Sequence, residues 1–328
     1  MPLRILFCGT PAFAVPSLRL LIAQPAFRLE GVITQPDRPR GRGQHTAVSP
    51  VKAAALEAGL AVFQPERIKS DEAYDYIRRL APDVVIIIAY GQIVPPRLLE
   101  IPRFGWINLH ASLLPKYRGA APINWAILNG ETTTGLTTMR LDAGLDTGPM
   151  LLRYETEIGP EETAPELSAR LAEAGAPLVV ETFRRLDRGE IAPEPQDDSQ
   201  ATYAPVLKKS DGRIDWRLSC EHIYNQIRGL DPWPGAFTSF RGKTCHIWGR
   251  PLSTADFPRT GQSMLVADAE QPVLAPPGTI QAGHSLILVR CGDSGALVLT
   301  HVQLEGRKRI AAREFANGAH LNPSDRFE

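Results

Sequence analysis

Three polar side chains have the types and spacing that acyl-transfer chemistry needs. Asn108 and His110 stand two apart in GWINLHAS, and residues two apart in a strand point to one face of a sheet. An amide and an imidazole buried without partners would cost free energy, so we expect both at the strand's carboxyl end, where open α/β sheets bind ligands. Asp146 lies in the glycine-containing loop LDAGLDTGPM (141–150), from which its carboxylate could orient His110.

An amide, an imidazole and a carboxylate together suit direct transfer of an acyl group to an amine. The amide N–H and an imidazolium can stabilise a developing oxyanion, and imidazole or water can remove the amine proton. No obvious nucleophilic Ser or Cys lies between them, which favours transfer without a covalent intermediate. From spacing alone two alternatives stay open. Asn108 and His110 could form a hydrogen-bonded core pair, and Asp142 and Asp146 could both be turn formers.

The elements that must position these residues alternate between strand and helix. The predicted strands are 3–8, 29–34, 61–65, 83–91 and 106–112, and the predicted helices are 11–23, 50–59, 71–80 and 162–188. The run DVVIIIAYG (83–91) is so uniformly apolar that both faces of its sheet should be covered. This order predicts a doubly wound, mostly parallel α/β sheet of the Rossmann-like type.

The composition of the chain changes after residue 188. Residues 189–204 are polar and rich in proline, which is typical of a linker. A predicted helix at 220–230 is followed by short strand-like pieces at 236–242, 244–250, 278–283, 285–291 and 296–304. We therefore expect a catalytic domain over 1–188, a linker over 189–207, and a small OB-like β-barrel over 208–328.

Composition excludes several classes of protein. The 328 residues contain 36 Lys+Arg and 36 Asp+Glu, so bulk charge does not hold the chain to nucleic acid, although local basic patches could. The apolar run Val84–Tyr90 is too short to span a bilayer. The first residues lack a signal-peptide pattern and the four cysteines are far apart, so we expect a cytoplasmic protein with no metal site. No GxGxxG, Walker, HExxH or GxSxG motif is present.

Longer motifs around these residues resemble the 10-formyltetrahydrofolate-dependent formyltransferases. NLHASLLPKYRGAAPINWAILNGE and, after it, GLTTMRLDAGLDTGPML carry the Asn-x-His, Ser-Leu-Leu-Pro and distal Asp of that family in order. RILFCGTPAFAVPSL and TQPDRPRGRG resemble the members that formylate methionyl-initiator tRNA, and RIDW, DPWPGAF and APPGTI resemble their C-terminal barrel. The resemblance implies transfer of a formyl group from 10-formyltetrahydrofolate to the α-amine of methionyl-initiator tRNA, for translation initiation.

The resemblance also implies roles for individual residues. The catalytic trio would be Asn108, His110 and Asp146. The tetrahydrofolate site would be lined by Ser112, Leu113, Leu114, Pro115, Tyr90 and Gly91. The contacts to tRNA would come from the loop 35–44 and from the barrel, through Arg38, Arg40, Arg42, Lys208, Lys209, Arg307 and Lys308. The enzyme would act as a monomer, without a catalytic metal and without a membrane.

Other functions compete with this interpretation. Nucleotide-sugar formyltransferases, which act on a UDP-4-amino sugar, share the DPWPGAF segment (231–237). Glycinamide ribonucleotide formyltransferase would leave the second domain unexplained. A non-catalytic RNA-binding protein with the barrel as reader would be favoured by loss of the trio, but all three residues are present.

Overall fold

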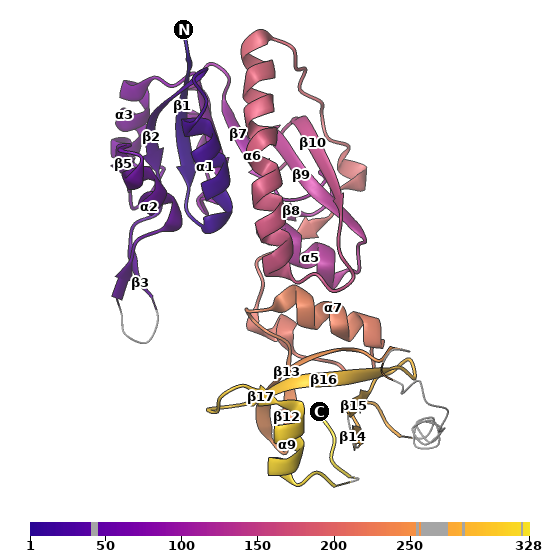
Figure 1. The fold of residues 1–328 in the computed structure, drawn as a ribbon. Coiled ribbons are helices and arrows are strands. Elements are labelled where there is room, and N and C mark those ends of the chain that lie inside the picture. The colour runs from indigo at the N-terminus through magenta and orange to yellow at the C-terminus, as the bar shows by residue number, and fades with distance from the viewer. Residues whose placement is uncertain (41–44, 254–255, 257–274, 284–285, 323) are drawn as a thin grey trace. The chain divides into compact units, whose positions relative to one another are not determined.

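The computed structural model describes residues 1–40, 45–253, 256, 275–283, 286–322 and 324–328. The chain forms two compact units, each made of several stretches (Figure 1). The first comprises Met1–Ile123, Thr133–Ile158 and Glu166–Pro205, and the second comprises Asn124–Thr132, Gly159–Pro165 and Val206–Glu328. No helix in the described part of the chain is long and apolar enough to cross a membrane.

The first unit is built on a seven-stranded sheet. In spatial order its strands are β10 (Met150–Glu157), β9 (Thr133–Arg140), β7 (Trp106–His110), β6 (Val84–Ile88), β1 (Leu3–Gly9), β2 (Phe27–Ile33) and β5 (Val62–Phe63). The pairs from β7 to β5 are parallel, whereas β9 and β10 pair antiparallel at one edge. The predicted mostly parallel α/β class is confirmed.

Helices cover both faces of this sheet. The first unit contains η1 (Ala12–Ala14), α1 (Val15–Ile22), α2 (Pro50–Glu57), α3 (Asp71–Leu80) and α4 (Pro96–Leu99). Two helices are shared with the second unit: α5 (Pro122–Leu128) continues into it, and α6 (Ala164–Arg188) has its first two residues there. Leu6, Val85 and Ile87 pack with residues of α3 and α4 on one face. On the other face Gly175 of α6 lies against Leu109. All of β6 is buried, as its apolar run predicts.

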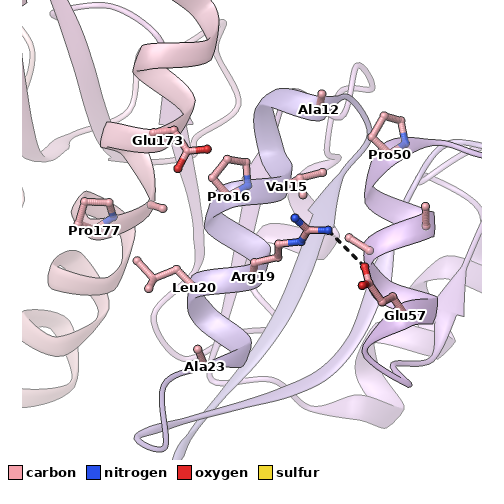
Figure 2. Close-up of a pocket in the computed structure, with 13 residues that line it drawn as sticks. Ala12, Val15, Pro16, Arg19, Leu20, Ala23, Pro50, Glu57, Glu173 and Pro177 are labelled. Carbon is pink, nitrogen blue, oxygen red and sulfur yellow. Dashed lines mark hydrogen bonds and ion pairs between the residues drawn. The ribbon is translucent and has the colours of Figure 1, made fainter.

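A groove lies between α1, α2 and α6 on the outside of the first unit (Figure 2). Small side chains line it, among them Ala12, Pro16 and Pro177, and Arg19 pairs with Glu57 at 3.2 Å across part of it. Asn108, His110 and Asp146 are not among its lining residues. The groove therefore does not coincide with the residues that could do acyl-transfer chemistry.

Most of the segment expected to link the domains is part of the first unit. Glu194 pairs with Met150 by backbone hydrogen bonds, and β11 (Tyr203–Ala204) pairs in parallel with β8 (Arg118–Gly119). A short helix, η2 (Asp198–Gln200), lies between them. A second two-stranded sheet, β3 (Arg38–Arg40) with β4 (His45–Ala47), forms part of the loop expected to contact tRNA.

The second unit has a curled antiparallel sheet, consistent with the predicted OB-like barrel. Its strands are β12 (Phe237–Phe240), β13 (Lys243–Pro251), β16 (Ala296–Leu304), β15 (Ile287–Arg290) and β14 (Ile280–Ala282), with β17 (Ile310–Ala311) beside β16. Among the described residues from 206 onward, the sheet is accompanied by η3 (Lys209–Gly212), α7 (Cys220–Leu230) and α9 (Ala312–Ala319). A core that includes Ile223, Ile247 and Phe315 holds α7 and α9 to the sheet.

Two early pieces of the chain complete the second unit. The Asn124 amide donates to the Gly229 carbonyl at 2.7 Å. The buried Arg228 guanidinium donates to the carbonyls of Gly159 and Glu162 at 3.1 and 2.8 Å. These bonds satisfy the buried cation with backbone oxygens, as a buried charge requires.

Candidate active site

Strand β7 brings Asn108 and His110 to the end of the parallel part of the sheet. His110 is the last residue of the strand, and both residues pair with β9, Asn108 opposite Met139 and His110 opposite Thr137. His110 is buried, and Asn108 is partly buried. Leu109 points the other way, toward α6. The strand thus holds the amide and the imidazole on one face, as their spacing predicts.

The hydrogen bonds of His110 define which nitrogen carries its proton. Its Nε2 lies 2.9 Å from the carbonyl oxygen of Tyr117. Because a carbonyl oxygen only accepts, Nε2 carries the hydrogen and donates. The other nitrogen, Nδ1, lies 3.7 Å from Oδ2 of Asp146. In the neutral imidazole Nδ1 is therefore the basic atom, and a carboxylate stands beside it to stabilise a proton gained there.

Asp146 is held by contacts from two other segments. Its Oδ2 accepts the backbone N–H of Gly119 at 2.8 Å, and its Oδ1 lies 3.5 Å from Nδ2 of Asn108. Its backbone is in the left-handed region, with φ at 52°. Asp142 behaves differently: its carboxylate accepts from Gly144 N and Thr147 Oγ1 within the loop. Of the two aspartates, Asp142 is the turn former and Asp146 joins Asn108 and His110.

Gly119 is a position in the site that requires glycine. Its φ is +124°, and a Cβ would lie 2.6 Å from the carbonyl oxygen of Ala204. We expect Gly119→Ala to break the β8–β11 pairing, to free the Asp146 carboxylate, and to lower stability by about 1–3 kcal/mol. Thermal unfolding and exchange of the residue 119 amide would measure both effects.

Gly59→Ala is the matched control for that substitution. Gly59 also has a positive φ, +69°, but a Cβ there would meet nothing within 4 Å. Its cost is therefore backbone strain alone. Equal destabilisation by the two substitutions would show that contact with Ala204 is unimportant.

The Ser-Leu-Leu-Pro segment forms a tight turn after β7. The buried Ser112 hydroxyl donates to the Lys116 carbonyl at 2.6 Å, and Thr137 Oγ1 donates to the Ser112 carbonyl at 2.7 Å. Leu114 is packed in a small core cluster. The side chains of Leu113 and Pro115 are only partly buried. The turn thus uses Ser112 and Leu114 for folding and leaves Leu113 and Pro115 nearer the surface.

The chain turns sharply after β6, where Tyr90 and Gly91 lie. Ala89 and Gly91 both have positive φ and are exposed, whereas the Tyr90 side chain is buried. Burial raises the pKa of the Tyr90 hydroxyl, which has no hydrogen-bond partner among the described residues. Gln35 Nε2 donates to the Tyr90 carbonyl at 2.9 Å. Exposed backbone, rather than the Tyr90 ring, is therefore what this turn offers to a ligand.

Gln196 and Arg118 also belong to the site, and sequence reasoning missed both. The Gln196 amide donates to the carbonyls of Asp146 and Gly148 at 2.8 and 2.7 Å. Arg118 is buried and donates to Gln196 Oε1 through Nε and Nη2. Gln196 lies in a polar, proline-rich stretch without periodicity, so no local signal could have distinguished it from a linker residue.

The basic loop expected to contact tRNA is anchored at its base. Asp37 is ion-paired with Lys52 and accepts from Gln64 at 3.0 Å, and these two bonds lower the pKa of the Asp37 carboxyl. Arg38 is exposed. Arg40 ends β3, and Arg42 lies outside the described residues. Because Lys52 neutralises the Asp37 carboxylate, that carboxylate does not offset the positive charge of Arg38.

The basic residues of the second unit flank the strands β13 and β16. Lys208, Lys209, Arg307 and Lys308 are exposed. Burial, and then the charge of Lys209, lower the pKa of His246 on β13. Gln303 lies opposite His246 on β16, and its side chain donates to the Arg307 carbonyl at 2.9 Å.

A tryptophan lies on the same side of β13. His246 and Trp248 alternate with Ile247, which faces the core. The Arg309 guanidinium lies 4.0 Å from the centre of the Trp248 ring, a cation–π contact. This face of the sheet therefore combines cations with an aromatic ring.

The described residues hold no group of three His, Cys, Asp or Glu side chains that could bind a metal ion. The four cysteines are buried and unpaired.

Comparison with family models identifies the chain. The formyl transferase model matches residues 4–183, and the formyl transferase C-terminal domain model matches residues 206–320. The chain belongs to the formyl transferase family. This formyl transferase is 52% identical to a methionyl-tRNA formyltransferase of Solibacter usitatus over 326 residues, 99% of this chain and 98% of that one. It is 49% identical to one of Acidobacterium capsulatum over 326 residues, 99% of each chain.

Two solved structures share the fold. WlaRD, a sugar 3N-formyl transferase determined with dTDP and 5-N-formyl-THF, superposes with a TM-score of 0.64 at 17% identity, covering 94% of this chain and all of that one. HypX from Aquifex aeolicus, in complex with tetrahydrofolic acid, gives a TM-score of 0.61 at 17% identity, covering 96% of this formyl transferase and 47% of HypX. At this identity the likeness concerns the fold alone.

Proposed function

We propose that this chain transfers the formyl group of 10-formyltetrahydrofolate to the α-amine of methionyl-initiator tRNA. The observation that carries the proposal is near-full-length similarity, at about half of all positions, to proteins named methionyl-tRNA formyltransferase. The convergence of Asn108, His110 and Asp146 supplies groups suited to that reaction. We also propose that residues 1–188 carry the chemistry, and that the barrel 208–328 assists in holding tRNA.

The geometry suggests a role for each member of the trio. The neutral amine nitrogen bonds to the formyl carbon while the bond from that carbon to N10 breaks. His110 Nδ1 takes the amine proton and returns it to the departing nitrogen, and Asp146 stabilises the imidazolium in between. Asn108 donates an amide hydrogen to the formyl oxygen as negative charge builds there. Only the amine hydrogen moves, so the exchange balances.

The residues proposed for the folate site suit a flat heteroaromatic group. Leu113 and Pro115 are apolar and partly exposed, and the turn at Ala89–Gly91 presents backbone donors and acceptors at the end of β6. Backbone groups of this kind can pair with the edge of a pterin ring. Ser112, Leu114 and Tyr90 would then contribute by holding these turns in shape, because their side chains are turned into the fold.

Two basic regions support the proposal that the partner is tRNA. One is the loop containing Arg38, Arg40 and Arg42. The other is the face of β13 and β16 flanked by Lys208, Lys209, Arg307 and Lys308. Cations attract phosphates, and an aromatic ring such as Trp248 can stack on an unpaired base. We further propose that the enzyme works as a monomer in the cytoplasm, where charged tRNA is available.

The direct experiment is a formyl-transfer assay with three acceptors in parallel. The donor is 10-formyltetrahydrofolate, and the acceptors are methionyl-initiator tRNA, methionyl-elongator tRNA and a UDP-4-amino sugar. We expect transfer to the initiator alone. Transfer only to the sugar would keep the trio and the folate site but overturn the tRNA assignment, and no transfer at all from folded protein would overturn the reaction.

Replacing both Arg40 and Arg42 with alanine tests the basic loop. We expect the KM for methionyl-tRNA to rise about tenfold at low salt, because each phosphate contact contributes to affinity and to its salt dependence. The KM for the folate donor should not change. Steady-state kinetics at two salt concentrations would measure this, with Arg188→Ala at the end of α6 as a control for lost surface charge. An unchanged KM for tRNA at both salt concentrations would contradict the role.

A further inference from the structure

The loop around Asp146 has an unusual backbone. The φ of Asp146 is 52°, in the left-handed region, which Asp and Asn tolerate better than other side chains do. The neighbouring Gly148 has no room for a Cβ, which would lie 1.9 Å from the Arg140 carbonyl oxygen. The loop therefore passes close to the end of β9 in a conformation that contacts must hold in place.

Gln196 supplies two of these contacts from a distant segment. Its Nε2 donates one hydrogen to the Asp146 carbonyl at 2.8 Å and the other to the Gly148 carbonyl at 2.7 Å. Both hydrogens of the amide are therefore used on the two sides of Thr147. The side chain of Gln196 acts as a clamp on the backbone of the loop.

Arg118 fixes which way the Gln196 amide points. Its Nε and Nη2 lie 3.0 and 2.8 Å from Oε1 of Gln196, and its Nη2 also donates to Asp198 at 2.7 Å. A guanidinium only donates, so the amide must turn its oxygen toward Arg118 and its nitrogen toward the loop. The Arg118 side chain itself is buried, being 2% exposed.

The same elements hold the carboxylate of Asp146. Gly119, next to Arg118 in β8, donates its N–H to Oδ2 at 2.8 Å. β8 is in turn paired with β11, which begins three residues after the end of η2. Strand β8 thus holds the carboxylate of Asp146, and the segment 194–204 holds its backbone.

We propose that Gln196, oriented by Arg118, is a positioning residue for the reaction. It does not touch the reacting atoms in this arrangement but holds the Asp146 carboxylate beside His110 and Asn108. The proposal deepens the formyl-transfer function proposed above and rests on it. By this proposal the segment 189–207, which the sequence predicts to be a linker, contributes to catalysis.

The substitution Gln196→Glu removes the clamp on the loop but keeps an acceptor for the buried Arg118. A glutamate keeps an acceptor for the guanidinium but has no hydrogens for the carbonyls of Asp146 and Gly148. We expect kcat to fall about tenfold to a hundredfold, as displacement of a catalytic group by about 1 Å can cause. The KM values for tRNA and folate, and the melting temperature, should stay the same. Gln200→Glu is the matched control, because the Gln200 amide donates to Asp197 rather than to the loop that holds Asp146.

A double-mutant cycle tests whether Gln196 acts through Asp146. In an Asp146→Asn background, Gln196→Glu should cause no further loss, because the group that it positions is already gone. If the two losses multiply, or if Gln196→Glu alone leaves kcat at the wild-type value, the proposal is overturned. A loss of kcat that comes with raised KM values and a lower melting temperature would also overturn it, in favour of a merely structural role.

Hydrogen exchange provides a readout that does not depend on activity. In Gln196→Glu we expect faster exchange of the Gly119 amide and of the loop 141–149, with the rest of the sheet unchanged. If the wild-type protein formylates no acceptor but the exchange result holds, the proposed function fails while the clamp stands. If exchange in the loop does not change, the clamp itself is wrong.

Discussion

His110→Gln is expected to lower kcat/KM for formyl transfer to methionyl-tRNA by about a thousandfold, within the range for loss of a general base. Glutamine can place its amide nitrogen near the position of Nε2, and so can still donate to the Tyr117 carbonyl. It has no basic atom to replace Nδ1, which faces Asp146 at 3.7 Å. The substitution therefore removes the proton acceptor while keeping the buried hydrogen bond. Initial rates at saturating folate would measure the loss.

The control for this substitution is His222→Gln. His222 is an exposed residue in the first turn of α7, with no place in the proposed chemistry. Its replacement should leave kcat/KM unchanged. Both variants should melt near the wild-type temperature. If His110→Gln keeps near-wild-type turnover, His110 is not the base and the assignment of the trio falls.

Asp146→Asn should lower kcat by about a hundredfold with little change in KM, because it removes the charge that stabilises a protonated His110. Asparagine has nearly the same shape, and its oxygen can still accept from Gly119 N. The left-handed backbone at this position is also one that asparagine tolerates. The loss in kcat can then be attributed to charge rather than to a displaced loop.

Asp142→Asn tests the distinction between the two aspartates. Asp142 accepts from Gly144 N and Thr147 Oγ1, and an amide oxygen can accept in the same way. Its replacement should cost little activity. If Asp142→Asn and Asp146→Asn reduce kcat equally, the loop as a whole matters and Asp146 has no special role.

Sequence patterns predicted best the elements with strong local signals. The predicted helices over 71–80 and 220–230 match the observed bounds of α3 and α7. The structure shows why each begins where it does, because Ser70 and Ser219 cap the two N-termini. The buried run of β6 was equally clear. In contrast, β9 and β10 were not predicted: their sequences are rich in Thr, Arg and Glu, and much of β10 is exposed at the sheet edge.

The site also contains residues that the sequence predicts and residues that it does not. The spacing of Asn108 and His110 placed them on one face of a strand, which the structure bears out. Nothing local distinguished Asp142 from Asp146, because only contacts with β7 and β8 do so. Gln196 was out of reach for the same reason, since its partner Arg118 is 78 residues away. Long-range hydrogen bonds of this kind produce no periodic pattern of residue types in a sequence.

The composite second unit has a consequence for the order in which the protein can be made. Asn124 precedes its partner Gly229 by 105 residues. At ribosomal speeds of about 5–20 residues per second, roughly 5–20 seconds separate the synthesis of the two. Gly159 and Glu162 are likewise synthesised well before their partner Arg228. During that interval parts of the future second unit are already outside the ribosome with their backbone oxygens and amides still in water. A chain that ends at Pro205 would lack the partners Arg228 and Gly229 altogether.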